Sequence, residues 1–121
     1  MGKYKVLNVE DDMFKHAAIS RALKARNCVI DLAKTGDEAM ELIESNSYDF
    51  IVSDMQFPVQ GKYNTEGGLW VMEHIKDRHI PIMFCSSANL VMENIPTVYY
   101  SDSNYNFAND LIKGMNELLK S

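Results

Sequence analysis

Carboxylates stand directly after two apolar runs of this sequence, and they are the residues best suited to chemistry. Glu10, Asp11 and Asp12 follow the first such run, and Asp54 follows the third. Carboxylates held close together repel one another, so they take up protons or share a cation. Oxygen ligands with no His or Cys beside them in sequence suit a hard ion such as Mg²⁺. Acid after a strand also often only caps the next helix, so the carboxylates alone leave both roles open.

Two further residues favour a site over simple capping. Asp54 beside a bound cation could attack a phosphoryl donor and form an aspartyl phosphate. In such reactions positioning and electrostatics supply most of the catalysis. Ser86 ends another apolar run, where its hydroxyl could donate a hydrogen bond to a phosphoryl oxygen, and the next two residues, Ser87 and Ala88, are small. An ordinary loop serine is the alternative for Ser86 taken alone.

Short apolar runs alternate along the chain with stretches of helical period. Strands are predicted at residues 4–9, 28–32, 48–53, 80–85 and 97–100. Helices are predicted at residues 13–26, 35–47, 69–78 and 107–119, with at most a short helix over 89–94. This alternation predicts an α/β fold with a parallel sheet covered on both faces.

The predicted fold is a single doubly wound domain over residues 1–121, with a five-stranded parallel sheet of order 2-1-3-4-5. No internal repeat or linker interrupts it. In such sheets, sites form beyond the carboxyl ends of the strands, where the strand order reverses. The first and third strands are neighbours at that reversal, so their acidic ends are expected to meet in one crevice.

Composition sets limits on other functions. The chain has 121 residues and a formal charge of −5 without a long basic cluster, which disfavours direct binding to nucleic acid. No apolar stretch approaches the roughly 20 residues of a membrane span, and acid falls where a signal peptide would stay apolar. Cys28 and Cys85 lie far apart in apolar runs, which predicts two reduced core thiols in a cytoplasmic protein.

Three segments together resemble the receiver domain of bacterial response regulators in two-component signalling. They read VLNVEDD, FIVSDMQFP and IPIMFCSSA, and the resemblance covers nearly the whole chain in order and spacing. An acidic pair, an Asp followed four residues later by Pro, and a hydroxyl residue after the fourth strand form a specific combination. The resemblance implies a flavodoxin-like (βα)5 fold and makes Ser86 the hydroxyl that responds to the phosphoryl group.

The same resemblance implies a metal site. Glu10 and Asp11 would be the acidic pair that binds Mg²⁺, and Asp54 would be both the phosphoacceptor and a third ligand. Gln56 would offer its backbone carbonyl to the metal. Asp12 either assists through a water molecule or caps the first helix, and both roles stay open.

Partners and output also follow from the resemblance. A histidine kinase or phosphotransfer protein would donate the phosphoryl group, and the chain would catalyse only its own phosphorylation and slow dephosphorylation. With no output domain predicted, the signal would pass through protein–protein contacts with an unknown target or a homodimer. The alternatives are a receiver-like interaction module that works without phosphorylation, and a small phosphohydrolase of the haloacid-dehalogenase kind. The sequence Asp54-Met55-Gln56 lacks the second Asp of that last class.

The sequence departs from the family pattern in three places. The family has a lysine and a proline after its last strand, and residues 97–103 contain neither. The segment 59–66 is longer than usual, and the stretch between Ser86 and the last strand is shorter, so a helix there is short or missing. Lys62 in the long segment is our hypothesis for a replacement cation, and a solvated loop lysine is its alternative.

Overall fold

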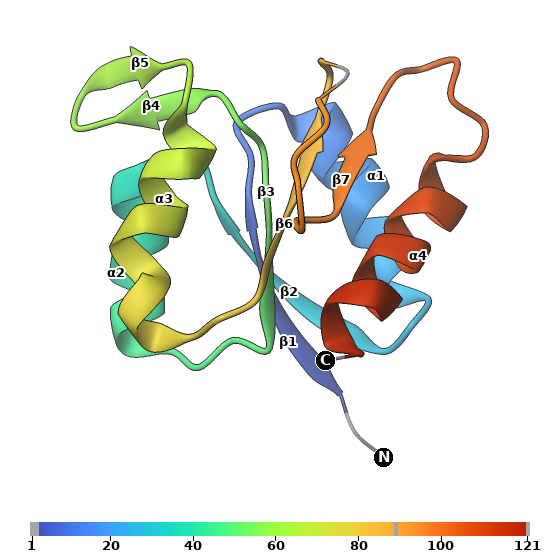
Figure 1. Cartoon of the computed structure of the whole chain (residues 1–121), viewed down its shortest axis with the longest axis horizontal. Coiled ribbons are helices and arrows are strands. Elements are labelled where there is room, and N and C mark those ends of the chain that lie inside the picture. The colour runs from blue at the N-terminus through green and yellow to red at the C-terminus, as the bar shows by residue number, and fades with distance from the viewer. Residues whose placement is uncertain (1–2, 89, 121) are drawn as a thin grey trace.

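A five-stranded parallel sheet forms the centre of the molecule (Figure 1). The computed structural model describes residues 3–88 and 90–120. The sheet strands are β1 (Tyr4–Val9), β2 (Cys28–Ala33), β3 (Phe50–Ser53), β6 (Ile82–Ser86) and β7 (Thr97–Tyr99). Their order is β2-β1-β3-β6-β7, while β4 and β5 form a separate hairpin. The sheet strands therefore follow the predicted order 2-1-3-4-5, and the predicted fold class is confirmed.

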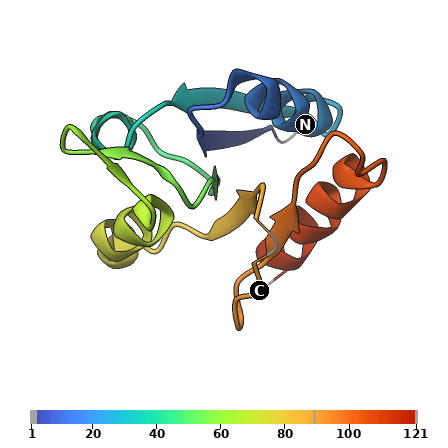
Figure 2. The same cartoon turned by 90° about the horizontal axis from the view of Figure 1, so that it is seen from above.

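Helices cover both faces of the sheet. They are α1 (Met13–Lys24), α2 (Gly36–Ser45), α3 (Gly67–Ile75), with a 3₁₀ turn over Lys76–Arg78, and α4 (Phe107–Leu119). Helices α2 and α3 contact each other on one face, and α1 and α4 on the other (Figure 2). Each face buries its own apolar cluster. None of the helices in the described residues is long and apolar enough to cross a membrane.

Capping residues fix where the first two helices begin. The Asp12 side chain accepts hydrogen bonds from the backbone N–H groups of Phe14 and Lys15, at 2.9 and 3.3 Å. Thr35 does the same for the N–H of Glu38, at 3.0 Å. Such side chains satisfy donors that the first helical turn leaves unpaired. Of the two roles left open for Asp12, capping is thus the one that the structure shows.

The long polar segment before α3 is a hairpin, which the sequence analysis missed. Strands β4 (Phe57–Val59) and β5 (Lys62–Asn64) pair antiparallel. The two residues between them, Gln60 and Gly61, have φ of 53° and 80°. Two positive φ values in a two-residue loop are typical of the tight turn that suits twisted hairpins. The hairpin lies at the end of the molecule where β1 and β3 terminate (Figure 1).

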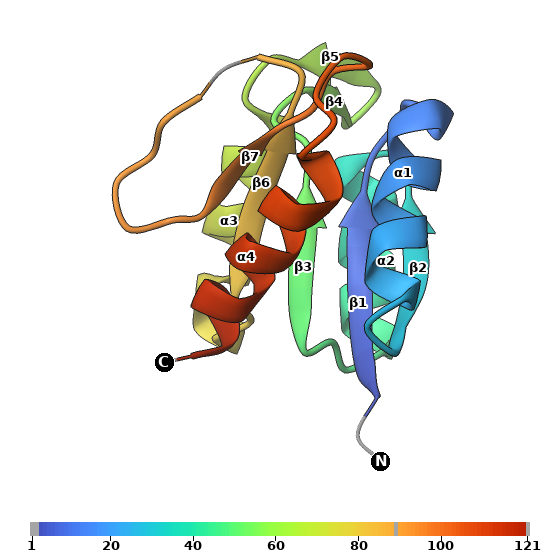
Figure 3. The same ribbon diagram turned by 90° about the vertical axis from the view of Figure 1, so that its right-hand side faces the viewer.

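The connection between β6 and β7 carries no helix over residues 90–96. It runs as an extended loop away from the sheet (Figure 3). A proline at position 96 and only ten residues between the two strands leave little room for a helix. The prediction of a short or missing helix is correct for the part of this connection that the structure describes.

Both cysteines lie in the core, as predicted. Cys28 and Cys85 are buried free thiols on β2 and β6. They belong to the apolar cluster beneath α1 and α4. Burial raises the pKa of the Cys85 thiol to about 12, so this thiol stays protonated at neutral pH and is a poor nucleophile.

Candidate functional site

Three carboxylates meet at the carboxyl ends of β1 and β3. Glu10, Asp11 and Asp54 each offer an oxygen, and these atoms lie within 4.8 Å of one another. The sheet register produces this meeting, because Val9 and Ser53 are partners in neighbouring parallel strands. The N–H of Asp54 then donates to the Val9 carbonyl at 2.9 Å, so the residues after each strand stay side by side. The structure thus brings together the three carboxylates that the sequence analysis selected.

A buried lysine from α1 lies among these carboxylates. The Nζ of Lys15 is 3.2 Å from Oε1 of Glu10 and 3.1 Å from Oδ1 of Asp54. The Lys15 side chain is only 2 % exposed, and Glu10 is fully buried. The pocket therefore contains a positive charge of its own.

The charges in this pocket are not fully balanced. Burial raises the pKa of the Glu10 carboxyl to about 8, with Lys15 opposing the rise and Asp54 adding to it. Burial favours the neutral amine of Lys15, but Glu10 and Asp54 outweigh it and raise the pKa of Lys15. Lys15 therefore stays an ammonium, and the pocket resists a second ionised carboxylate unless another cation enters.

One carboxylate oxygen of Glu10 lacks a hydrogen-bond donor among the described residues. Its Oε1 is buried and accepts no hydrogen bond within residues 3–88 and 90–120. Lys15 Nζ is close enough for an ion pair with this oxygen, but is not aligned as a hydrogen-bond donor. A buried oxygen of this kind is costly unless it is paired. Three oxygen donors around an under-compensated pocket fit Mg²⁺, with Glu10, Asp11 and Asp54 as the residues that would hold it.

The two oxygens of the Asp54 carboxylate have different surroundings. Its Oδ1 accepts a hydrogen bond from the Met55 N–H at 2.7 Å and pairs with Lys15. Both contacts use Oδ1, and neither involves Oδ2. Asp54 is 9 % exposed, so little water competes at the carboxylate.

Ser86 lies at the carboxyl end of β6, the strand next to β3. Its side chain is 6 % exposed. Its Oγ accepts a hydrogen bond from the Ala88 N–H at 3.1 Å. The hydroxyl hydrogen thus remains free to be donated to another acceptor, and its role toward a phosphoryl group stays a prediction.

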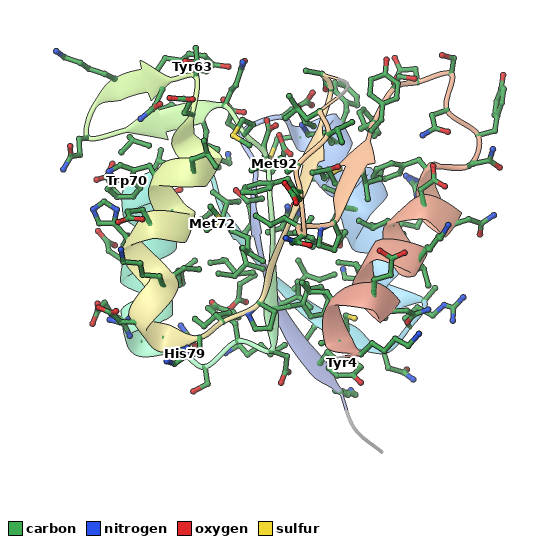
Figure 4. All side chains as sticks on the ribbon, viewed as in Figure 1. Tyr4, Tyr63, Trp70, Met72, His79 and Met92 are labelled. Carbon is green, nitrogen blue, oxygen red and sulfur yellow. The ribbon has the colours of Figure 1, made fainter. Side chains whose placement is uncertain are left out.

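Gln56 stands where the chain leaves β3 for the hairpin. The side chain is exposed, and its Oε1 accepts a hydrogen bond from the Tyr63 hydroxyl at 3.2 Å. Tyr63 extends from the hairpin at the same end of the molecule (Figure 4). This bond ties the hairpin to the segment that follows Asp54. The metal-binding role of the Gln56 carbonyl stays a prediction.

The hypothesis for Lys62 is not supported. Lys62 is exposed on β5 and pairs with Val59 in the hairpin. Of the ion pairs formed by the described residues, none involves Lys62, whereas two involve Lys15. Pairing within the hairpin fixes the Lys62 backbone, while α1 carries Lys15 directly into the carboxylate cluster. The hypothesis placed a cation on the hairpin, whereas the lysine that pairs with Glu10 and Asp54 comes from α1.

A signal for Lys15 was present in the sequence. Its position is four residues before Ile19 and eight before Leu23, and these three are the buried residues of α1. A lysine aligned at helical spacing with the apolar face is placed toward the core. Phe14, the apolar residue next to Lys15, is by contrast 85 % exposed. Lys15, and not Phe14, therefore completes the buried row formed with Ile19 and Leu23.

Comparison with known proteins identifies a matching family and a similar sequence. Residues 6–100 match the family model described as the response regulator receiver domain. A curated hybrid signal transduction histidine kinase B from Dictyostelium discoideum is 37 % identical over 54 residues, which is 45 % of this chain and 3 % of that protein. The chain thus spans a very small part of that relative.

Two solved structures share the fold. The chemotaxis response regulator CheY4 of Vibrio cholerae has a TM-score of 0.77 at 18 % identity, covering 98 % of this chain and 100 % of that one. The receiver domain of a sensor histidine kinase from Pseudomonas aeruginosa has a TM-score of 0.76 at 19 % identity, covering 99 % of this chain and 100 % of that one. That second structure holds a magnesium ion coordinated in its active site cleft.

Proposed function

The chain belongs to the response regulator receiver family of two-component signalling, and from this premise we propose that Asp54 accepts a phosphoryl group with the help of Mg²⁺. The observation that carries the proposal is the Asp54 carboxylate, which has one oxygen held and the other available beside Glu10 and Asp11. The donor would be a histidine kinase or a phosphotransfer protein. That the similar Pseudomonas receiver comes from a sensor histidine kinase supports this choice.

Each residue of the site has a defined part in the proposed transfer. Oδ2 of Asp54 forms a bond to phosphorus while the bond from phosphorus to the donor breaks, and the donor leaves with that electron pair. The Met55 N–H holds Oδ1 in place during the attack. The Ser86 hydroxyl would donate to a phosphoryl oxygen. Bound Mg²⁺ would supply positive charge for the oxygens of the transferring group.

Slow hydrolysis would return the protein to its starting state. Water would attack the phosphorus and release phosphate and the free Asp54 carboxylate. Burial of the Asp54 side chain limits the access of water and so favours a long-lived phosphorylated form. The chain would thus act as a signalling switch in the cytoplasm that catalyses only its own phosphorylation and dephosphorylation. The signal would pass through contacts with another protein.

Incubation with Mg²⁺ and acetyl phosphate, followed by intact mass measurement, tests this function. A single phosphoryl adduct is expected for the wild-type chain and none for Asp54→Asn. Asp12→Asn is the matched control, because Asn caps a helix as well as Asp does and its adduct should be unchanged. An adduct that persists in Asp54→Asn would contradict the assignment of the phosphoacceptor.

A second candidate is an interaction module that works without phosphorylation. The absence of a helix over residues 90–96 and of a lysine in residues 97–103 favours it. The same experiment separates the two functions. A wild-type chain that forms no adduct and does not bind Mg²⁺ would support the interaction module.

A further inference from the structure

Lys15 is unusual among the charged residues of this protein. Within the described residues, it is the one lysine or arginine whose side chain is buried. Lysines near a surface normally extend their ammonium group to water. Lys15 instead points inward, and its Nζ contacts one oxygen of Glu10 and one of Asp54. A residue held in this way is costly unless its charge is used or balanced.

The geometry gives Lys15 direct access to the reacting group. Its Nζ is 3.1 Å from Oδ1 of Asp54, and Oδ1 shares its carbon atom with Oδ2, the oxygen that would bond to phosphorus. An ammonium group has three donors, and the carboxylates of Glu10 and Asp54 are its two ion-pair partners. A donor therefore remains for a third acceptor at the same place.

Phosphorylation would change what this ammonium contacts. A phosphoryl group joined to Asp54 brings three charged acceptor oxygens into the pocket, while Oδ1 becomes an uncharged carbonyl oxygen. Glu10 would at the same time be drawn toward bound Mg²⁺. Lys15 would then exchange its contact with Glu10 for one with a phosphoryl oxygen.

We propose that Lys15 is the catalytic cation of this site, pairing with Asp54 before transfer and with the phosphoryl oxygens after it. The inference rests on the proposed function of Asp54. It assigns to helix α1 the positive charge that is absent from residues 97–103. It also assigns Lys62 to the solvated surface, where its exposure places it.

The test compares Lys15→Met and Lys15→Arg with two exposed lysines, Lys24→Met on the same helix and Lys62→Met on the hairpin. Isothermal titration calorimetry measures the Mg²⁺ dissociation constant, and intact mass follows adduct formation from acetyl phosphate. Loss of the ammonium should tighten Mg²⁺ binding by about tenfold or more, because a competing charge leaves the ligand oxygens. Adduct formation in Lys15→Met should slow by about 100-fold.

Lys15→Arg should recover part of the transfer rate, and both control variants should match wild type. A wild-type chain that forms an adduct, with Lys15→Met matching it in rate and Mg²⁺ affinity, overturns this inference and leaves the proposed function intact. Slow transfer with weaker Mg²⁺ binding in both Lys15 variants also overturns it, because that result marks a purely structural residue. A wild-type chain that forms no adduct overturns the proposed function itself.

A further pair of variants covers the case in which Lys15→Met does not fold. Glu10→Gln/Lys15→Met removes one formal negative and one formal positive charge together. The net formal charge of the pocket is thus the same as in wild type, and the double variant is compared with Glu10→Gln alone, using circular dichroism to check folding. Slower adduct formation in the double variant supports the inference, and equal rates overturn it.

Discussion

The end of the sheet formed by β1 and β3 differs sharply from the edge formed by β6 and β7. At the first, a six-residue strand pairs on both sides, and the buried groups that follow it are held by neighbours with defined contacts. At the second, β7 has three residues, and residues 90–96 reach it without a helix. The positive charge of the site belongs to the first region, on α1. The charges of the pocket therefore depend on elements at the centre of the sheet and not on its short edge.

The position of the Lys15 ammonium depends on α1 and not on the edge strand β7. Lys15 is held by α1, whose N-terminus is capped by Asp12 and whose buried row packs on the sheet. A lysine after β7 would depend on the short edge strand and its loops. Helix α1 also contacts α4, the second helix on that face of the sheet.

The largest expected effect is on the stability of Lys15→Met without metal. Removal of one partner from a buried ion pair leaves the other charge uncompensated, which costs about 3–5 kcal/mol. Urea denaturation in EDTA should show this loss in the free energy of unfolding. Mg²⁺ at 100 times its dissociation constant should add about 2.7 kcal/mol by binding the folded state, so at one fixed Mg²⁺ concentration the tighter-binding Lys15→Met should gain more than wild type.

Lys24→Met is the control for this measurement, because Lys24 is an exposed residue of the same helix. Its free energy of unfolding should stay within about 0.5 kcal/mol of wild type. If Lys15→Met and Lys24→Met were equally stable in EDTA, Lys15 would not balance the carboxylates. The positive charge of Lys15 would then not distinguish the region at β1 and β3 from the edge at β6 and β7.

The next largest difference in stability between the two regions is expected from alanine substitutions at two glycines. A Cβ at Gly68, in the first turn of α3, would lie 2.6 Å from the Asp54 carbonyl oxygen and 2.7 Å from the Phe84 ring. Gly68→Ala should therefore destabilise the protein by about 1–3 kcal/mol through overpacking. It should also slow adduct formation, because the backbone of Asp54 must shift. Urea denaturation and the mass measurement check the two effects.

Gly114 on α4 is the matched position at the other region. A Cβ there would meet the Met83 side chain at 2.7 Å, with Val98 and Pro96 at 3.5 and 3.6 Å. The end of a methionine side chain can move, and Ala is favoured over Gly inside a helix by about 1 kcal/mol. Gly114→Ala should thus be neutral or stabilising and leave adduct formation unchanged. Equal losses in the two variants would show that both regions are packed with the same rigidity.

The sequence was sufficient to predict the fold and the carboxylates, because both depend on local patterns. Strand β1 and helix α4 have the predicted bounds, and Glu10, Asp11 and Asp54 meet because parallel strands end at the same edge. The hairpin was missed because its strands have three residues each, too few for an alternating pattern to be seen.

Lys15 was missed for a different reason. The helix over residues 13–26 was predicted from the spacing of its apolar residues alone, so a charged residue was not considered for its buried face. A lysine is buried only when a tertiary partner compensates its charge. Those partners, Glu10 and Asp54, are distant from one another in sequence and come together only in the folded sheet. The helical spacing with Ile19 and Leu23 indicates which way Lys15 faces, but no local pattern indicates which groups compensate its charge.

Asp12→Ala should have a smaller effect, because Asp12 only caps α1. Loss of a capping side chain costs about 1 kcal/mol, and urea denaturation should show that change. The Mg²⁺ affinity should stay near that of wild type, since Asp12 is outside the carboxylate cluster. A tenfold weaker Mg²⁺ affinity, measured by calorimetry, would instead assign Asp12 to the metal site.

The smallest effect is expected at the edge loop, where Val91 is 92 % exposed. Its neighbours Leu90 and Met92 are partly buried against the core, so the alternation of an extended segment turns Val91 outward. Val91→Ser should change the free energy of unfolding by less than about 0.5 kcal/mol and leave adduct formation unchanged. A larger loss in urea denaturation, or a slower adduct, would mean that this loop supports the site. The geometry of the carboxylate pocket would then depend on the edge at β6 and β7, and the two regions would not be independent.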